Sequence, residues 1–307
     1  MEASVAIGQL AEGVSEPPFR DAGPIALPGS TPPWRWPAIV GLEVRSAIRA
    51  RWSVAAVGLS LALALFFVAV ATRESSIVGF TGFGRVLDGV VQAGLLFVPL
   101  LALLSTTQAI TAARQQGVLE WYLSYPNGRA RCYAAIVLPR LAAIVIPVVV
   151  TTGLLGVAPA LMGQPVPGTL LGDDLALLAG QAACFGGLGA WISASSRTPE
   201  EALLRALGAW MALVALVDFA VLAVMLRWQL PPQIVFAIAA VNPVQAGRVG
   251  ILAAMDPTLG VLGPVGTWAT LTFGTPAVIA WGLGWPVVLA GGLLGMGLRA
   301  FRRLDVG

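Results

Sequence analysis

Long stretches without a charged side chain dominate this sequence. They cover residues 52–72, 89–113, 141–172, 175–196, 206–226 and 257–298, and only the stretch 206–226 contains a charge, at Asp218. A helix rises 1.5 Å per residue, so about 20 apolar residues cross the hydrocarbon core of a bilayer. Each stretch is long enough to do this. The sequence therefore predicts an all-α, polytopic membrane protein with six transmembrane helices.

Composition supports a lipid environment and narrows the chemistry. Hydrophobic residues make up 57% of the 307 residues and charged residues only 11%, whereas soluble domains carry about 25% charged residues. The chain contains neither lysine nor histidine. Without lysine it lacks a G-x-x-x-x-G-K-[ST] loop for nucleotide phosphates, and without histidine it lacks Ser-His dyads and H-E-x-x-H zinc sites. Cys132 and Cys184 form no C-x-x-C pair. We expect no catalytic residue, no metal site and no cofactor of its own.

The distribution of arginine predicts the orientation, because arginine and lysine accumulate in cytoplasmic loops. With a cytoplasmic N-terminus, 14 arginines lie inside and only Arg73, Arg85, Arg227 and Arg248 lie outside. Both termini are then cytoplasmic. The net charge of +3 reflects this topology and does not indicate a surface for nucleic acid, which needs a basic face on a soluble domain.

The first part of the chain differs from the rest. Residues 1–37 contain seven prolines and four acidic residues, which predicts a flexible cytoplasmic tail before a membrane domain of residues 38–307. From Ala38 to Trp52, apolar residues recur at helical spacing while Arg45 and Arg49 share another face. This pattern favours an amphipathic helix on the inner leaflet. The alternative is a simple prolongation of the first span.

The cytoplasmic loop 114–131 is predicted to carry a short helix before a turn at 126–128. Val118, Leu119, Tyr122 and Leu123 share one side of it. A helix in a loop between spans offers a surface to another protein. The alternative is an inert connecting helix on lipid headgroups.

Three features belong to the membrane region. Gly180, Gly186, Gly187 and Gly189 in the fourth span allow helices to approach closely. Asp218 in the fifth span either forms an interhelical hydrogen bond or is a polar group that lines a transport path. A rival function is a secondary transporter that uses Asp218 as its proton-coupling group. The outer segment 227–268 is too broken by proline and glycine for a clean span, so we expect short helices in the outer leaflet or over a pore mouth.

Four motifs resemble those of a known family. The sequence GVLEWYLSYPNGR resembles the G-T-L-E-x-L-L-S-Y-P-x-x-R signature of ABC-2 type permeases. R-S-A-I-R-A-R-W before the first span, V-D-F in the fifth span and V-N-P-V-Q-A-G-R in the outer segment agree with it. Within this family the chain is most similar to the permeases of transporters that mature nitrous oxide reductase. Departures include Val118 in place of threonine and glutamine at positions 115 and 116 in place of acidic residues.

The resemblance implies a permease subunit in the bacterial inner membrane. It implies a homodimer with two cytoplasmic ATPase subunits, which bind the ATP, and a periplasmic β-helix protein as a further partner. The loop 114–131 would dock on the ATPase through Glu120, Tyr122, Tyr125, Pro126 and Arg129, and Asn242, Pro243 and Arg248 would form a gate or contact the periplasmic protein. The implied role is transport or mechanical signalling for copper–sulfur cluster maturation.

Two further readings stay open at the level of sequence. One is the permease of a different ABC-2 exporter for a drug, lipid or polysaccharide. The other is an intramembrane enzyme, which ranks last because Asp218 has no second carboxylate beside it in sequence for acid–base catalysis.

Overall fold

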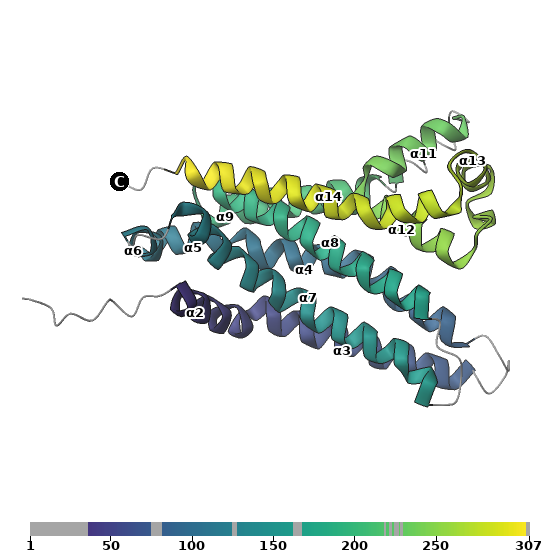
Figure 1. Ribbon diagram of the computed structural model, residues 1–307, viewed down its shortest axis with the longest axis horizontal. Coiled ribbons are helices and arrows are strands. Elements are labelled where there is room, and N and C mark those ends of the chain that lie inside the picture. Colours follow the sequence, from purple (N-terminus) through teal and green to yellow (C-terminus); the bar gives the residue numbers. More distant parts are fainter. Residues whose placement is uncertain are drawn as a thin grey trace, which may run out of the picture. The chain divides into compact units, whose positions relative to one another are not determined.

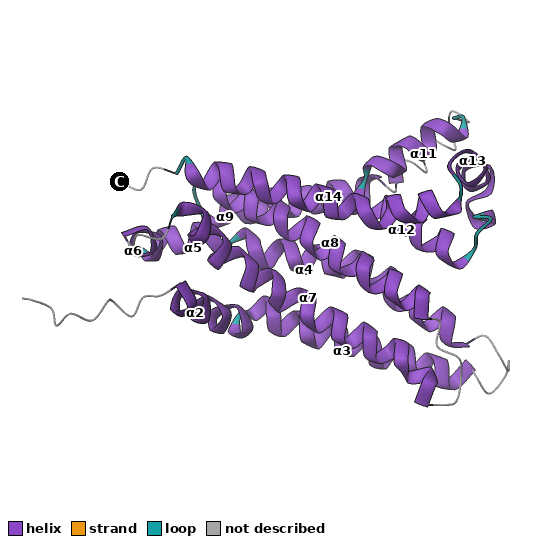
Figure 2. Cartoon of the chain, viewed as in Figure 1, coloured by secondary structure: helices purple, strands orange, loops and turns teal. Residues whose placement is uncertain are grey.

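The computed structural model describes residues 36–74, 82–124, 128–161, 168–217, 219–220, 223, 227 and 230–304. Every regular element in these residues is a helix, and none is a strand (Figure 2). The all-α prediction is confirmed for this part of the chain. The chain separates into two units at residues 38 and 39, and the description below concerns the second unit.

Five long helices form the body of this unit in its described residues. They are α3 (Arg51–Glu74), α4 (Gly82–Thr107), α7 (Arg129–Leu161), α8 (Gly168–Ser195) and α14 (Thr275–Arg302), and they run side by side (Figure 1). Each covers all or much of one charge-free stretch, because an apolar segment in lipid must satisfy its backbone polar groups internally and a helix does so. α8 packs extensively against α14 and α4, and also against α7.

Helix length and apolarity identify the candidate membrane spans. Within the described residues, four single helices are long and apolar enough to cross a membrane: Gly89–Gln115, Arg129–Gly156, Gly168–Ser195 and Thr275–Arg302. Two bent pairs, Val40–Arg49 with Arg51–Phe66 and Pro232–Val241 with Pro243–Met255, raise the number to six if each is one span. The second pair lies in the predicted outer segment, whereas the predicted fifth span is only partly described. The chain is thus a multi-pass membrane protein, and the six-span count stays a prediction.

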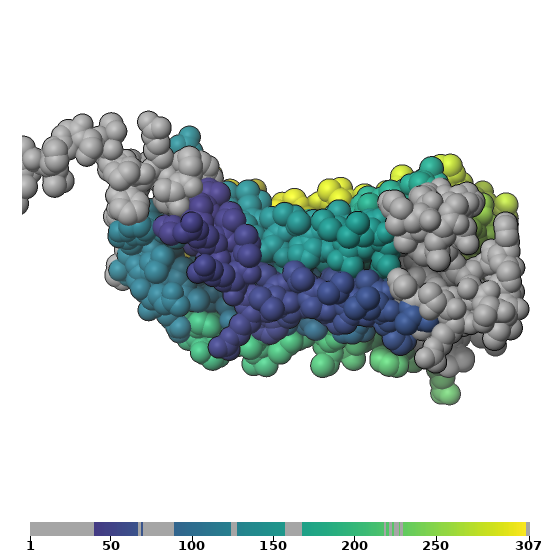
Figure 3. Space-filling view, turned by 90° about the horizontal axis from the view of Figure 1, so that it is seen from below, coloured from purple at the N-terminus to yellow at the C-terminus, as the bar shows by residue number. Residues whose placement is uncertain are grey.

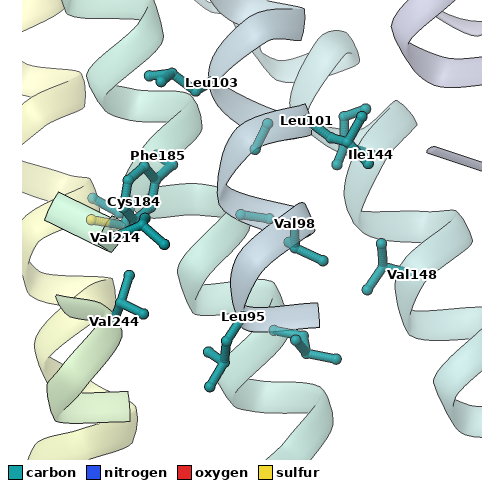
Figure 4. Close-up of a cluster of buried hydrophobic side chains, with 14 of the residues drawn as sticks. Leu95, Val98, Leu101, Leu103, Ile144, Val148, Cys184, Phe185, Val214 and Val244 are labelled. Atoms are coloured by element: carbon teal, nitrogen blue, oxygen red, sulfur yellow. The ribbon is translucent and has the colours of Figure 1, made fainter. Parts of the chain in front are cut away.

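Small residues on α8 let neighbouring helices approach. A β-carbon at Gly187 would lie 3.3 Å from the carbonyl oxygen of Ala290 in α14, and one at Gly189 would lie 2.6 Å from that of Leu103 in α4. The predicted close approach at these glycines is confirmed. Around them lies the main apolar cluster (Figure 4), in which Phe185 and Cys184 of α8 point toward side chains of α4, of the π-helix η1 (Met211–Leu216) and of α12 (Pro243–Met255).

A break separates α2 (Trp36–Arg49) from α3. The two helices meet at Ala50 with a bend of 53°. The Ser53 hydroxyl spans the break by donating a hydrogen bond to the carbonyl oxygen of Ala47. α2 is therefore a separate helix and not a straight prolongation of the first span; its position on the inner leaflet stays a prediction.

Six shorter elements with described bounds lie between α8 and α14 in the sequence. They are α9 (Pro199–Trp210), the π-helix η1 (Met211–Leu216), α11 (Pro232–Val241), α12 (Pro243–Met255), the 3₁₀ turn η2 (Gly260–Leu262) and α13 (Gly263–Phe273). α11 and α12 are bent by 113° at Asn242. As predicted, the described part of segment 227–268 consists of short helices, of which α12 packs along α14 and α8.

Candidate functional site

Two short helices connect α4 to α7, and the second of them lies in the predicted cytoplasmic loop 114–131. α5 covers Ala109–Gln115 and α6 covers Val118–Ser124. In the last turn of α4, Thr106 and Thr107 donate their hydroxyls back to carbonyls of the preceding turn, at 3.0 and 2.6 Å, and such bonds often bend a helix. Gly117 then takes a φ of +69°, which glycine adopts without strain, and the chain turns into α6.

The start of α5 is held by α8. The Ser193 hydroxyl accepts hydrogen bonds from the backbone N–H groups of Ile110 and Thr111, at 3.0 and 3.3 Å. These N–H groups belong to the first turn of a helix, where no intrahelical carbonyl is available. α5 is therefore fixed to the membrane bundle at its N-terminus.

The two sides of α6 differ in burial. Leu119 is fully buried and Tyr122 is 4% exposed, whereas Glu120 and Trp121 are exposed. The apolar side predicted from the sequence is thus confirmed for its two central members. Glu120 faces away from the rest of the described chain and is the one predicted docking residue on α6 with a free surface.

Tyr122 is placed differently from the prediction that it faces a partner. Its hydroxyl donates a 3.0 Å hydrogen bond to Oε1 of Glu43 in α2. Nη1 of Arg140 in α7 lies 3.2 Å from Oε2 of the same carboxylate. The same nitrogen donates a 2.8 Å hydrogen bond to the carbonyl of Ile136. The bond to Ile136 uses one of the two hydrogens on Nη1, and the contact with Glu43 is an ion pair.

Burial sets the chemistry of this cluster, which we call the Glu43 cluster (Glu43, Tyr122 and Arg140). The side chains of Glu43 and Arg140 are 8% and 18% exposed. Burial, with the neighbouring Glu43 carboxylate as the next cause, raises the pKa of the Tyr122 phenol above its ordinary value. Tyr122 is therefore a neutral hydrogen-bond donor at physiological pH.

Sequence reasoning missed Glu43 and Arg140. Two signals were present. Glu43 is the only acidic residue in the amphipathic segment 38–52, and Arg140 directly precedes the charge-free stretch 141–172. An isolated charge in such a segment needs an opposite charge nearby, but the sequence does not say which.

Arg129 also makes contacts within the chain. Its Nη1 donates to the backbone carbonyls of Arg302 and Leu304, the latter at 3.2 Å. These carbonyls end α14, where a cation favourably opposes the helix dipole. The guanidinium is exposed, so a role at a partner surface stays a prediction. Tyr125, Pro126 and Asp218 lie outside the described residues.

The predicted gate residues lie at the bend between α11 and α12. Oδ1 of Asn242 caps α12 by accepting from the N–H groups of Val244 and Gln245, at 2.9 and 3.3 Å. Its Nδ2 donates to the carbonyl of Leu213 in η1, at 2.6 Å. Asn242 is 4% exposed. In this structure its amide holds the bend together.

Pro243 and Arg248 follow on α12. The carbonyl of Pro243 accepts a 2.6 Å hydrogen bond from Nε2 of Gln181, a fully buried residue of α8. Arg248 is half-buried, and its Nη1 lies 3.5 Å from Oε1 of Gln245. The bend is thus anchored to α8 as well as to η1.

Two tryptophans of α14, which sequence reasoning missed, complete the bend. Trp281 donates its indole N–H to the carbonyl of Ala240 at 3.1 Å, and Trp285 donates to that of Val241 at 2.8 Å. Their rings stack with centroids 4.8 Å apart. The last carbonyls of α11 have no intrahelical partner, so these indoles satisfy them without water. The signal was a pair of tryptophans at i and i+4 in an apolar span.

No group of three or more His, Cys, Asp or Glu side chains that could hold a metal ion occurs in the part of the chain that the structure describes. Cys132 and Cys184 are free and buried. The chemistry available at both regions is hydrogen bonding, ion pairing and apolar packing.

Comparison with known proteins identifies the family. The sequence profile of the ABC-2 family transporter proteins matches residues 37–306. The chain belongs to this family. The ABC-2 family comprises membrane subunits of transporters that work with an ATPase partner and are not catalytic enzymes by themselves. Among similar proteins is the probable ABC transporter permease protein NosY of Pseudomonas aeruginosa. It is 27% identical over 223 residues, which cover 70% of this chain and 80% of NosY.

Proposed function

We propose that this ABC-2 protein is the permease subunit of an ATP-driven transporter in a bacterial inner membrane, and that α6 is the docking helix for a separate cytoplasmic ATPase. The observation that supports the proposal is the two-sidedness of α6. Leu119 and Tyr122 are buried against the membrane domain, while Glu120 and Trp121 are exposed on the opposite side. Aromatic side chains are frequent interface anchors, and an exposed carboxylate can pair with a basic group across an interface.

The arrangement in the membrane follows from the proposal. Both termini are cytoplasmic and the chain has six spans, which agrees with the excess of arginine in the predicted inner loops. Two copies of the chain would associate with two ATPase subunits, and the ATP is bound by those subunits. The segment 227–268 then lies on the outer side, where Asn242, Pro243 and Arg248 form a gate or contact a periplasmic partner.

We further propose that the transporter serves copper–sulfur cluster maturation of nitrous oxide reductase, with a periplasmic β-helix protein as an additional partner. Support comes from the similarity to NosY and from the V-N-P-V-Q-A-G-R motif in the outer segment. Deleting the gene in a denitrifying host and measuring the copper content and activity of its nitrous oxide reductase tests this assignment. A fully loaded reductase would refute it and leave the general permease function standing.

The docking surface is tested by charge reversal. The purified chain, reconstituted in lipid nanodiscs, is titrated with the ATPase subunit of the transporter, and binding and ATP hydrolysis are measured. Glu120→Arg should weaken binding by roughly a hundredfold, because charge repulsion at an interface costs several kcal/mol. Glu200→Arg is the matched control, since Glu200 is an exposed carboxylate in the first turn of α9. Equal binding by both variants and the unaltered chain would contradict docking through α6.

A further inference from the structure

The helix α2 presents different chemistry on its two sides. Leu42 and Ile48 are 48% and 62% exposed, with exposed Arg45 close by, as in helices that lie at a membrane surface. On the opposite side Glu43 and Ala47 are only 6% and 1% exposed. A carboxylate on the inward side of such a helix needs a partner inside the protein, because burial of an unpaired charge is unfavourable. Figure 3 shows α2, in purple, beside the surface formed by α5 and α6.

The carboxylate of Glu43 joins three helices. One oxygen accepts from the hydroxyl of Tyr122 in α6, and the other lies 3.2 Å from Nη1 of Arg140 in α7. α2 is remote in sequence from α6 and α7: Glu43 and Tyr122 are 79 residues apart. The Glu43 cluster therefore connects a surface helix, a loop helix and a membrane-spanning helix through one side chain.

The helix α6 depends on such a connection. It has seven residues, and isolated helices shorter than about 12–15 residues are marginal in water. Gly117 joins it to α5, and glycine is the residue with the greatest backbone freedom, so this junction does not fix the direction of α6. Its hold on the membrane domain comes from the burial of Leu119 and from Tyr122, whose backbone carbonyl also lies 3.7 Å from Sγ of Cys132 in α7.

We propose that Glu43 is a positioning residue for coupling: it ties α6 to α2 and α7, so that a displacement of α6 is passed into the membrane-spanning helix α7 and to α2 at the membrane surface. This inference rests on the proposed function in one respect, namely that α6 is the helix on which the ATPase docks. α6 cannot separate from α2 unless Tyr122 leaves the buried carboxylate, and α2 cannot separate from α7 unless the Glu43–Arg140 ion pair is divided. Both separations leave a poorly hydrated charge with fewer partners.

The tie is tested first without the ATPase. Hydrogen–deuterium exchange of residues 118–124 is compared in nanodiscs for the unaltered chain, Tyr122→Phe and Glu43→Gln. A hydrogen bond to a charged group contributes enough that its removal should speed exchange in α6 by about tenfold or more. Tyr133→Phe is the matched control, because the buried Tyr133 hydroxyl has no hydrogen-bond partner among the described residues. Unchanged exchange in Tyr122→Phe would overturn the tie.

The coupling role is tested next with the ATPase bound. At saturating ATPase, Tyr122→Phe should lower the stimulation of ATP hydrolysis per bound ATPase at least about threefold, and Tyr133→Phe should not lower it. If Tyr122→Phe speeds hydrogen–deuterium exchange in α6 but leaves this stimulation unchanged, transmission through Glu43 is refuted. The two proposals fail separately. If Glu120→Arg binds the ATPase normally while Tyr122→Phe speeds exchange in α6, the result refutes docking through α6 and supports the connection through Glu43. If Glu120→Arg weakens binding while exchange in Tyr122→Phe equals that of the unaltered chain, the result supports docking through α6 and refutes the connection through Glu43.

Discussion

Replacement of Gly282 by alanine tests how the bend between α11 and α12 is held against the membrane bundle. α12 and α14 touch backbone to backbone at this residue. A β-carbon at Gly282 would lie 2.6 Å from Cα of Gly250 and 2.6 Å from the carbonyl oxygen of Ala246. Non-bonded carbon atoms prefer a separation of about 3.5–4.0 Å. The two helices must therefore move apart by about 1 Å, since neither neighbouring atom belongs to a side chain that can rotate away.

The expected cost follows from two opposing terms. Overpacking of this kind costs about 1–3 kcal/mol. Alanine returns up to about 1 kcal/mol through its higher helix propensity. Gly282→Ala should therefore destabilise the protein by about 0–3 kcal/mol, and by about 1–3 kcal/mol relative to a glycine-to-alanine change that meets no neighbouring atom. Gly284→Ala is the control two residues further on: nothing lies within 4 Å of its added carbon, so the propensity gain is unopposed and stability should be unchanged or higher.

The assay is thermal unfolding of both variants in the same lipid nanodiscs, followed by circular dichroism and tryptophan fluorescence. Gly282→Ala should lower the Tm by several degrees relative to Gly284→Ala, at about 2–4 °C per kcal/mol for large domains. The fluorescence should also change, because Trp281 adjoins the shifted contact and stacks on Trp285. A Tm for Gly282→Ala equal to or above that of Gly284→Ala would refute the backbone contact between α12 and α14.

Three further outcomes are expected. In sealed vesicles of native orientation, a cysteine at Gly172 should react with a membrane-impermeant maleimide from outside and one at Gln116 should not, and the reverse labelling would refute the proposed orientation. Trp285→Phe should lower the free energy of unfolding by about 1–3 kcal/mol, because the carbonyl of Val241 loses its donor. Thermal unfolding of this variant is compared with that of Trp191→Phe, the same change in α8, and equal stability of the two variants would contradict the prediction. Asp218→Asn should be tolerated better than Asp218→Leu if Asp218 forms a hydrogen bond; loss of transporter activity in a normally folded asparagine variant would show that its charge is needed.

Part of the candidate site was accessible from the sequence because it depends on local pattern. The burial of Leu119 and the exposure of Glu120 follow from which residues share a side of a single helix. The broken outer segment was accessible for the same reason, since proline and glycine interrupt helices wherever they occur. The internal role of Tyr122 was not: its place on the apolar side of α6 was predicted, but its partner lies 79 residues away.

The sequence by itself determined the class of protein and located, in the described part of the chain, the four long apolar helices that are candidate spans on their own, because the transfer of each apolar or charged side chain between water and lipid depends mainly on that side chain. Only the tertiary structure decided how polar groups that remain in the interior are paired. Glu43 meets Tyr122 and Arg140, and Trp281 and Trp285 meet the last carbonyls of α11. These pairings depend on the packing of helices that are remote in sequence, and no local pattern specifies which donor reaches which acceptor once water is absent.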